Sequence, residues 1–306
     1  MIIIKDIVIL LVSIIVIGKG AVWLVDAAAR VAKHFGISEL VIGLTVVAFG
    51  TSAPEFGVTI LAAIRGMGDI SVGNIVGSNI FNLGFILGGT AIIHSLKTSR
   101  TIVFRDGFFL LFGGILLSVF LWDLTLSKIE GIVLFTLLVL YLLYLYFKKE
   151  TIETEEPTHA MYRWDPILLF VGIGLVIVGS HFLVESAVSI ARFMGVSDWV
   201  IGATIIAAGT SAPEFATSLT AAMKSRYGMS VGNLIGSDIF NLFGVLGVAG
   251  MMRNLSVGHD AHINLIILSF MIAVVLIFMR TGWVVSRKEG IILVMIGLLR
   301  WIYSFS

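Results

Sequence analysis

The feature that most limits the fold of this chain is a hexapeptide, Gly-Thr-Ser-Ala-Pro-Glu, that occurs twice within long apolar runs. The first copy spans residues 50–55 and the second spans residues 209–214. A charged side chain at membrane depth costs roughly 3 kcal/mol or more, so acidic residues there usually have a functional role. The duplication favours such a role for Glu55 and Glu214 over a structural one, in which buried, protonated carboxyl groups only hold helices together.

The composition indicates a membrane protein. Of the 306 residues 58% are hydrophobic and 13% are charged, and the mean hydropathy is +1.07, whereas about 25% of the residues in an average soluble domain are charged. A helix of about 20 apolar residues can span a bilayer, and the chain contains ten such segments. We therefore predict an all-α polytopic membrane protein with transmembrane helices at residues 3–25, 38–64, 71–96, 106–123, 128–147, 165–186, 197–222, 229–252, 262–280 and 286–304.

Other functional classes are disfavoured by what the sequence lacks. The chain has no cysteine, which excludes disulfides and thiolate metal sites. It also lacks the His-Glu-x-x-His signature of metalloproteases and any nucleophile–base pair beside the hexapeptides. We therefore expect neither an enzyme nor a cofactor. The net charge of +1, without a basic stripe, gives no indication of nucleic-acid binding, so the expected partners are ions and the lipid bilayer.

The second half of the chain repeats the first at an offset of 159 residues. Residues 41–63 match residues 200–222 at 14 of 23 positions, and residues 71–83 match 230–242 at 10 of 13. We divide the chain into a first half (1–147), a polar connector (148–164) and a second half (165–306). Because each half has five predicted helices, an odd number, the halves must enter the membrane in opposite directions, as in the inverted repeats of secondary transporters.

Positive charges near the helix ends predict the orientation. When successive loops are assigned to alternate sides, 13 Lys and Arg residues fall on one side and 6 on the other. Cytoplasmic loops carry the excess of Lys and Arg. We therefore predict a multi-pass protein of the cell (plasma) membrane with both termini extracellular and the connector cytoplasmic.

The proline of each hexapeptide predicts a broken helix. Pro54 has no N–H, so the carbonyl of Gly50 loses its helical partner, and the proline ring pushes that turn open. Pro213 and Gly209 repeat this arrangement. Irregular backbone at membrane depth is tolerated only where it lines a protein-walled or watery cavity. The loosened carbonyl groups, which can then face a cation, are those near Ala48, Thr51, Ala207 and Thr210.

Each hexapeptide is followed by a row of polar residues on one helical face, since positions i, i+4 and i+8 share a face. The rows are Asn74, Ser78 and Asn82, and Asn233, Ser237 and Asn241. Hydroxyl, amide, carboxylate and carbonyl oxygens are hard ligands that suit Ca²⁺ or Na⁺. Glu55 and Glu214 together carry a charge of −2, which one Ca²⁺ neutralises. Three Na⁺ ions would exceed this charge by one. An exchange of three Na⁺ for one Ca²⁺ would therefore move one net charge across the membrane.

On these motifs the chain resembles the prokaryotic sodium/calcium exchangers of the cation/calcium antiporter superfamily. The family's repeats carry Gly-Thr-Ser-x-Pro-Glu and then Gly-Asn-x-x-Gly-Ser-x-x-x-Asn, which stand here at 50–55 with 73–82 and at 209–214 with 232–241. The resemblance covers all ten predicted helices. It implies a ten-helix antiporter that exchanges Na⁺ for Ca²⁺ by alternating access, works as a monomer and uses helices 1 and 6 as a sliding gate.

The resemblance also implies which residues bind the ions. A Ca²⁺ site would be formed by Glu55, Glu214 and the carbonyl groups of Thr51 and Thr210. Flanking Na⁺ sites would be lined by Ser52, Ser78, Ala48, Ser211, Ser237 and Ala207. The middle would be closed by Asn82 and Asn241.

One position departs from part of the family. The potassium-dependent branch has Asp where this chain has Asn241, so we expect K⁺-independent exchange. Asp238 lies three residues earlier, about 60° round a helix from position 241, and is not expected to replace that Asp. It is expected to be a polar group that faces the cavity or lies behind the ligands.

Two other transport functions remain open. A proton/Ca²⁺ exchanger could use the same two carboxylates, and a passive cation channel could use the same pocket. Asp26 and Glu185, which align between the halves, lie near helix ends, where capping or solvation is the favoured interpretation.

Overall fold

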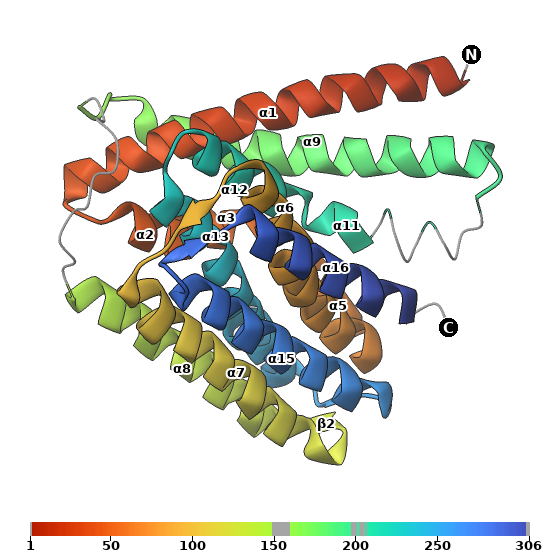
Figure 1. Ribbon diagram of the computed structural model, residues 1–306. Coiled ribbons are helices and arrows are strands. Elements are labelled where there is room, and N and C mark those ends of the chain that lie inside the picture. Colours follow the sequence, from red (N-terminus) through yellow and green to blue (C-terminus); the bar gives the residue numbers. More distant parts are fainter. Residues whose placement is uncertain (1, 149–159, 197–200, 202–204, 206, 304–306) are drawn as a thin grey trace.

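The structure, a computed structural model, describes residues 2–148, 160–196, 201, 205 and 207–303. Its first half contains α1 (Ile2–Phe35), α2 (Glu39–Ile42), η1 (Gly43–Val47), α3 (Ala48–Thr51), α4 (Ala53–Ile64), α5 (Gly68–Phe81), η2 (Asn82–Leu87), α6 (Gly88–Ile93), η3 (Ile102–Gly107), α7 (Phe108–Phe120), η4 (Leu121–Asp123) and α8 (Lys128–Phe147). Its second half contains α9 (Asp165–Phe193), α11 (Ala207–Thr210), α12 (Ala212–Met223), α13 (Tyr227–Ile239), η6 (Phe240–Val245), α14 (Leu246–Met252), α15 (Asp260–Arg280) and α16 (Arg287–Tyr303). Figure 1 shows these helices in one bundle.

Within these described residues, seven helical segments are long and apolar enough to cross a membrane, and the bent pair 39–51 and 53–64 forms an eighth. The predicted helix at 197–222 falls partly outside the described residues, and α16 is described over 17 residues. The ten-helix count and the inverted orientation of the halves therefore stay predictions. The connector prediction likewise falls largely on residues 149–159, outside the described part.

Two predicted helices are longer than expected. The first was placed at 3–25 but continues to Phe35, and the sixth was placed at 165–186 but continues to Phe193. The physical reason for the extension of α1 is that charged residues beyond its apolar stretch, such as Arg30, have ion-pair partners. The charged residues therefore do not mark the end of the helix.

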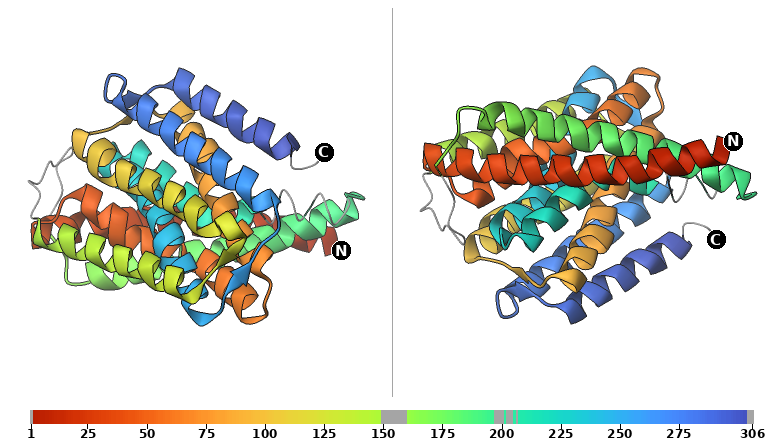
Figure 2. Two further views of the ribbon diagram at one scale, coloured as in Figure 1. Left: turned by 90° about the horizontal axis from the view of Figure 1, so that it is seen from below. Right: turned by 90° about the horizontal axis from the view of Figure 1, so that it is seen from above.

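The helices α1 and α9 lie side by side and antiparallel, and this α1/α9 pair crosses over the other helices (Figures 1 and 2). Near one end Ser189 Oγ donates to Asp6 Oδ2 over 2.6 Å, and near the other Arg30 pairs with Asp165 over 2.7 Å. Small residues allow the close approach: a Cβ atom on Gly172 would lie 2.7 Å from the backbone nitrogen of Leu24.

Two small antiparallel ladders, absent from the all-α prediction, join the halves at their loops. β1 (Leu96–Lys97) pairs with β4 (Val284–Val285), and β2 (Thr125–Leu126) pairs with β3 (Leu255–Ser256). At the repeat offset, β1 corresponds to β3 and β2 to β4, so each ladder is the counterpart of the other. The loops they join are those that the charge distribution assigns to the same side of the membrane.

A single large apolar cluster packs α5, α7, α13 and α15 together. At its centre the ring of Phe243 stacks on that of Phe109, with 4.5 Å between centroids, and lies against Gly113. This rigid packing holds α5 and α13 in the middle of the bundle. The two polar rows lie on α5 and α13 and on the turns η2 and η6 that continue them, and most of their side chains are buried.

Candidate functional site

Both hexapeptides break their helices, as the prolines predict. The first helix ends with α3 at Thr51 and restarts with α4 at Ala53, and the two segments turn by 52° at Ser52. The second has the same break at Ser211, between α11 and α12. Thr51 and Thr210, whose carbonyl groups are predicted ligands, are therefore the last residues of the short helices α3 and α11.

Reciprocal hydrogen bonds connect the two breaks. Ser52 Oγ donates to Glu214 Oε1 over 2.9 Å, and Ser211 Oγ donates to Glu55 Oε1 over 3.1 Å. Each residue in the second bond stands 159 positions from its counterpart in the first. The two acids, from opposite halves of the chain, are thus held next to each other's helix break. We call these four residues the glutamate site.

The second oxygen of each acid is buried without a hydrogen-bond partner among the described residues. This holds for Glu55 Oε2 and Glu214 Oε2, and both side chains are about 1% exposed. A buried polar oxygen without a partner costs about 1–3 kcal/mol, and more when it is charged. Two buried acids held at each other's helix break, each with one oxygen that lacks a hydrogen-bond partner, are the arrangement expected of ligands for a cation.

Polar bonds between neighbouring helices hold the acid-bearing turns in place. Asn74 Nδ2 donates to Thr59 Oγ1 over 2.9 Å, which ties α5 to α4. Asn233 Nδ2 donates to Ser218 Oγ over 2.9 Å, which ties α13 to α12 in the same way. The two asparagines thus have a bracing role, and Asn233 Oδ1 also accepts a hydrogen bond from Thr51 Oγ1 over 3.2 Å.

The remaining predicted ligands surround the breaks. Ala48 and Ser78 are buried, on α3 and α5. Ser237 Oγ lies 3.5 Å from Thr51 Oγ1, and the carbonyl oxygen of Ala48 lies 3.3 Å from the same hydroxyl. Ala207 begins α11, but its side chain lies outside the described residues.

Asn82 and Asn241 lie in a second group of buried polar residues. Asn82 Nδ2 donates to Asp238 Oδ1 over 2.9 Å, and Asn241 Nδ2 donates to Asn79 Oδ1 over 3.0 Å. Both asparagines lie where α-helix gives way to a π-helical turn, η2 or η6, and such turns are frequent at functional sites. We call Asn79, Asn82, Asp238 and Asn241 the middle layer.

Asp238 contacts one of the predicted ligands. Its position about 60° round the helix from Asn241 was expected to keep it out of that residue's place. In the structure Asp238 Oδ1 accepts a hydrogen bond from Asn82, so it lies against a predicted ligand, in keeping with the expectation of a polar group behind the ligands. The alignment of Asp238 with Asn79 was the available signal, since the repeat predicts that both take part in equivalent contacts.

A crevice of about 730 Å³ lies between α4, α9 and α11 and reaches both hexapeptides. Its walls include Pro54, Thr210 and His181. It adjoins the turn that carries Glu55 on one side and the α1/α9 pair on the other. The crevice therefore adjoins both hexapeptides and α9, and its walls are mostly apolar.

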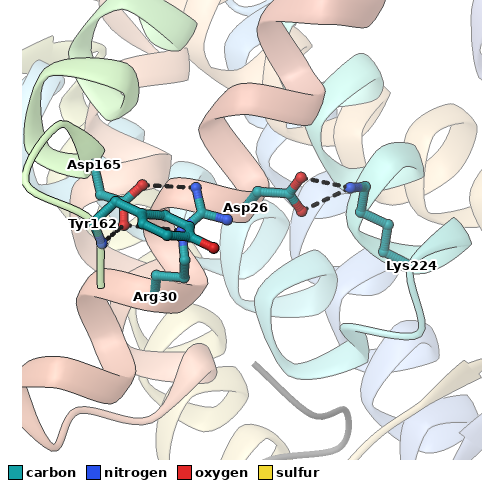
Figure 3. A network of polar contacts seen from close by, with 5 residues as sticks. All are labelled: Asp26, Arg30, Tyr162, Asp165 and Lys224. Atoms are coloured by element: carbon teal, nitrogen blue, oxygen red, sulfur yellow. Dashed lines mark hydrogen bonds and ion pairs between the residues drawn. The ribbon is translucent and has the colours of Figure 1, made fainter. Parts of the chain in front are cut away.

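An ion-pair network joins the α1/α9 pair to the rest of the protein (Figure 3). Lys224, at the end of α12, contacts both carboxylate oxygens of Asp26 on α1, at 2.7 and 2.8 Å. One turn away, Arg30 binds Asp165 at 2.9 and 2.7 Å and lies over the ring of Tyr162. Asp26 is thus paired rather than merely solvated, which corrects the expectation for this residue.

Within the described residues, no group of three or more His, Cys, Asp or Glu side chains lies close enough together to hold a metal ion. A cation at the glutamate site would therefore need hydroxyl, amide or carbonyl oxygens besides the two carboxylates. Such a mixed oxygen set suits ions that bind and leave, such as Na⁺ and Ca²⁺, rather than zinc or copper.

Comparisons with known proteins agree with the motifs. The chain is 32% identical to the "Sodium/calcium exchanger MaX1" of Methanosarcina acetivorans, over 94% of this chain and 95% of that one. It is 34% identical to the "Putative antiporter CaxA" of Alkalimonas amylolytica, over 93% and 94%. A solved structure of the sodium-calcium exchanger NCX_Mj, soaked with zero Na⁺ and Ca²⁺, matches with a TM-score of 0.88 and 32% identity over 99% of this chain and 100% of that one. The family profile described as "Sodium/calcium exchanger protein" matches residues 5–147 and 164–301, and the chain belongs to this family.

Proposed function

We propose that this protein is a secondary-active antiporter that exchanges Na⁺ for Ca²⁺ across the cell membrane by alternating access. The observation that carries the proposal is the glutamate site: two buried acids on broken helices, each bonded through Oε1 to the opposite break, with both Oε2 atoms left for a cation. The names of the related exchangers support Na⁺ and Ca²⁺ as the ions.

The proposed site residues are those predicted from the sequence. Ca²⁺ binds Glu55 and Glu214 with the carbonyl groups of Thr51 and Thr210. Na⁺ ions bind in the same region, and compete with Ca²⁺ because both need the two carboxylates. The remaining proposed ligands are Ser52, Ser211, Ser78, Ser237, Asn82, Asn241, Ala48 and Ala207.

The α1/α9 pair is proposed to slide between two positions and so open the site to one side of the membrane at a time. The contacts within the pair, at Asp6 with Ser189 and at Arg30 with Asp165, favour movement of the two helices as one unit. A single protomer contains both halves of the site, which supports a working monomer. Both termini are proposed to be extracellular.

A flux experiment tests this function. Proteoliposomes loaded with Na⁺ are diluted into Na⁺-free medium that contains Ca²⁺, and Ca²⁺ uptake is followed. Uptake should require the outward Na⁺ gradient. With three Na⁺ leaving for each Ca²⁺ that enters, one net positive charge leaves per cycle, so an interior-positive potential should accelerate uptake. Uptake that does not depend on Na⁺ would contradict the proposal.

The same vesicles distinguish the alternatives. A pH gradient in the absence of Na⁺ should drive no Ca²⁺ uptake, whereas a proton/Ca²⁺ exchanger would respond to it. Exchange of K⁺ for an inert organic cation on both sides should leave the rate unchanged if transport is K⁺-independent. Ca²⁺ entry without any counter-ion would indicate a channel.

A further inference from the structure

The contacts of the α1/α9 pair with the rest of the protein differ between the two halves. Asp26 on α1 contacts Lys224, the residue that caps the end of α12, at 2.7 and 2.8 Å. At the repeat offset of 159 residues, Asp26 corresponds to Glu185 on α9, and Lys224 corresponds to Arg65, which caps the end of α4. In both halves the sequence thus places an acid on the α1/α9 pair and a base at the end of a helix that carries one of the two hexapeptide acids.

The second set of charges is not in contact. The Glu185 side chain is 69% exposed, and its Oε2 lies 4.0 Å from Nε2 of His181, one turn earlier on α9. Arg65 is exposed as well, and no ion pair within the described residues includes it. The structure therefore has one formed ion pair, and the charges of its counterpart are apart.

The contacts inside the α1/α9 pair do not differ in this way. Arg30 contacts Asp165 over 2.7 Å. The counterparts of these two residues at the repeat offset are Ser189 and Asp6, and they are in contact over 2.6 Å. Both internal contacts are formed at once, whereas only one of the two contacts with the ends of α12 and α4 is formed. The difference between the halves therefore reflects where the α1/α9 pair lies on the other helices, and not how its two helices pack together.

We propose that Glu185 and Arg65 form the second of two alternating ion pairs. In the position that the structure shows, Asp26 binds Lys224 on the side predicted to be cytoplasmic. Movement of the α1/α9 pair to its other position separates these two residues and brings Glu185 to Arg65 on the opposite side. This inference rests on the proposed function, because it assigns one ion pair to each position of the sliding helices.

The exchange of one ion pair for an equivalent one keeps the two positions close in free energy, so that both are populated. The charges are partly or largely exposed, and exposed pairs are weak. Loss of either pair should therefore shift the balance between the two positions, or change the turnover rate, by at most about fivefold. This effect is far smaller than the loss expected when an acid of the glutamate site is removed.

The test measures which residues come close together in the purified full chain in detergent, so that it does not depend on transport. The chain contains no cysteine, and Arg65→Cys with Glu185→Cys places one thiol in each half. A protease site is inserted in the connector, and a short bifunctional thiol reagent is added. Cleavage of the connector then separates the halves on a denaturing gel unless the two cysteines have been cross-linked.

The two halves should become cross-linked at these positions. Lys224→Met should raise the rate of cross-linking by up to about fivefold, because loss of its contact with Asp26 favours the other position, and Asp26→Asn should do the same. Arg65→Cys with Ala187→Cys is the control, since position 187 lies about 200° round α9 from position 185. Cross-linking no faster than in this control, or no response to either substitution, overturns the proposal, whether or not the protein exchanges Na⁺ for Ca²⁺.

The reciprocal measurement tests the attraction between Glu185 and Arg65. In a chain with Asp26→Cys and Lys224→Cys, addition of Arg65→Met should raise the rate of cross-linking by up to about fivefold, because the competing ion pair is lost. Lys128→Met, which removes another exposed positive charge from the same predicted side, should leave the rate unchanged. An unchanged rate with Arg65→Met would show that the two residues do not attract each other in the other position, and would overturn the proposal.

Discussion

Ser52 Oγ donates a hydrogen bond to Glu214 Oε1 over 2.9 Å, although 162 positions separate the two residues in the chain. The bond joins the helix break of the first half to the acid of the second. Its counterpart, from Ser211 to Glu55, joins the helix break of the second half to the acid of the first. Neither half can form the glutamate site alone, so the repeat does more than double a motif: each copy positions the acid of the other.

The serine bonds predict symmetric effects on Ca²⁺ affinity. A hydrogen bond to a charged group contributes about 1.5–3 kcal/mol, and 1.4 kcal/mol corresponds to a factor of ten. Ser52→Ala and Ser211→Ala should therefore each weaken Ca²⁺ binding by about tenfold or more and by similar amounts. The measurement is the Ca²⁺ dependence of Na⁺-driven uptake. Ser118→Ala is the control, because Ser118 Oγ donates within α7, to the carbonyl of Gly114. A strong effect at one serine and none at the other would contradict reciprocal positioning.

The two acids should each be indispensable. Glu55→Gln keeps the acceptor oxygen for Ser211 but removes one of the two charges of the glutamate site, and Glu214→Gln does the same for Ser52. Loss of one member of a buried charge interaction costs roughly 3–5 kcal/mol, so Na⁺-driven Ca²⁺ uptake should fall by about 100-fold or more in each variant. Glu185→Gln is the matched control, since the Glu185 side chain is 69% exposed on α9. Substantial transport by either hexapeptide variant would show that the acids do not share one site.

Much of this site could be predicted because repeats and broken helices leave direct marks in a sequence. Pro54 and Pro213 predict the two breaks, and the structure places them two residues after the break residues Ser52 and Ser211. The pairing of each serine with the opposite acid could not be predicted, because it depends on how the two halves pack against each other. That packing is set by contacts between residues far apart in the chain, and the hexapeptide sequence does not predict such contacts.

The partners of Asp26 and Asp238 could not be predicted for a related reason. Local spacing places Asp26 near a helix end, where solvation is the simplest expectation, but Lys224 reaches it from a helix 198 positions away in the chain. Likewise, the angle between positions 238 and 241 describes one helix in isolation, whereas the partner of Asp238, Asn82, comes from the other half of the chain. The spacing of residues along a helix predicts which side chains share a face. Which of these side chains form contacts depends on the neighbouring helix.

The ion pair between Asp26 and Lys224 predicts an effect on the rate of transport. This ion pair joins α1 to the end of α12, the helix that carries Glu214. Movement of the α1/α9 pair relative to α12 must therefore strain or break the ion pair. The side chains are 29% and 33% exposed, and such pairs are worth about 1 kcal/mol or less. Asp26→Asn or Lys224→Met should therefore change the turnover rate by up to about fivefold while the Ca²⁺ affinity stays the same.

A charge exchange provides the control for this pair. The double variant Asp26→Lys with Lys224→Asp should bring the rate back toward that of the unchanged protein, because the ion pair is restored with its charges reversed. Arg30→Gln, in contrast, affects a contact within the α1/α9 pair. Its main effect should be a lower Tm and not a change in the turnover rate. Equal rates in all these variants would mean that the contact does not change during transport.

The predicted orientation can be tested with single cysteines, since the chain contains none. Lys128 lies at the start of α8 on the side predicted to be extracellular, and Arg100 lies before η3 on the side predicted to be cytoplasmic; both are exposed. In intact cells a membrane-impermeant maleimide should label Lys128→Cys and should label Arg100→Cys only after the membrane is opened. The reverse pattern would place both termini in the cytoplasm.

The close packing of α1 against α9 predicts a difference between two neighbouring glycines. A Cβ atom on Gly172 would lie 2.7 Å from the backbone nitrogen of Leu24 and 2.9 Å from the carbonyl oxygen of Gly20, whereas a Cβ atom on Gly174 would have nothing within 4 Å. Both substitutions to alanine gain the same helix propensity, about 1 kcal/mol, so their difference isolates the clash. Since overpacking costs about 1–3 kcal/mol, Gly172→Ala should lower Tm by several degrees relative to Gly174→Ala in detergent. A Tm for Gly172→Ala equal to or above that of Gly174→Ala would show that the two helices separate easily, and would remove the reason to treat the α1/α9 pair as one moving unit.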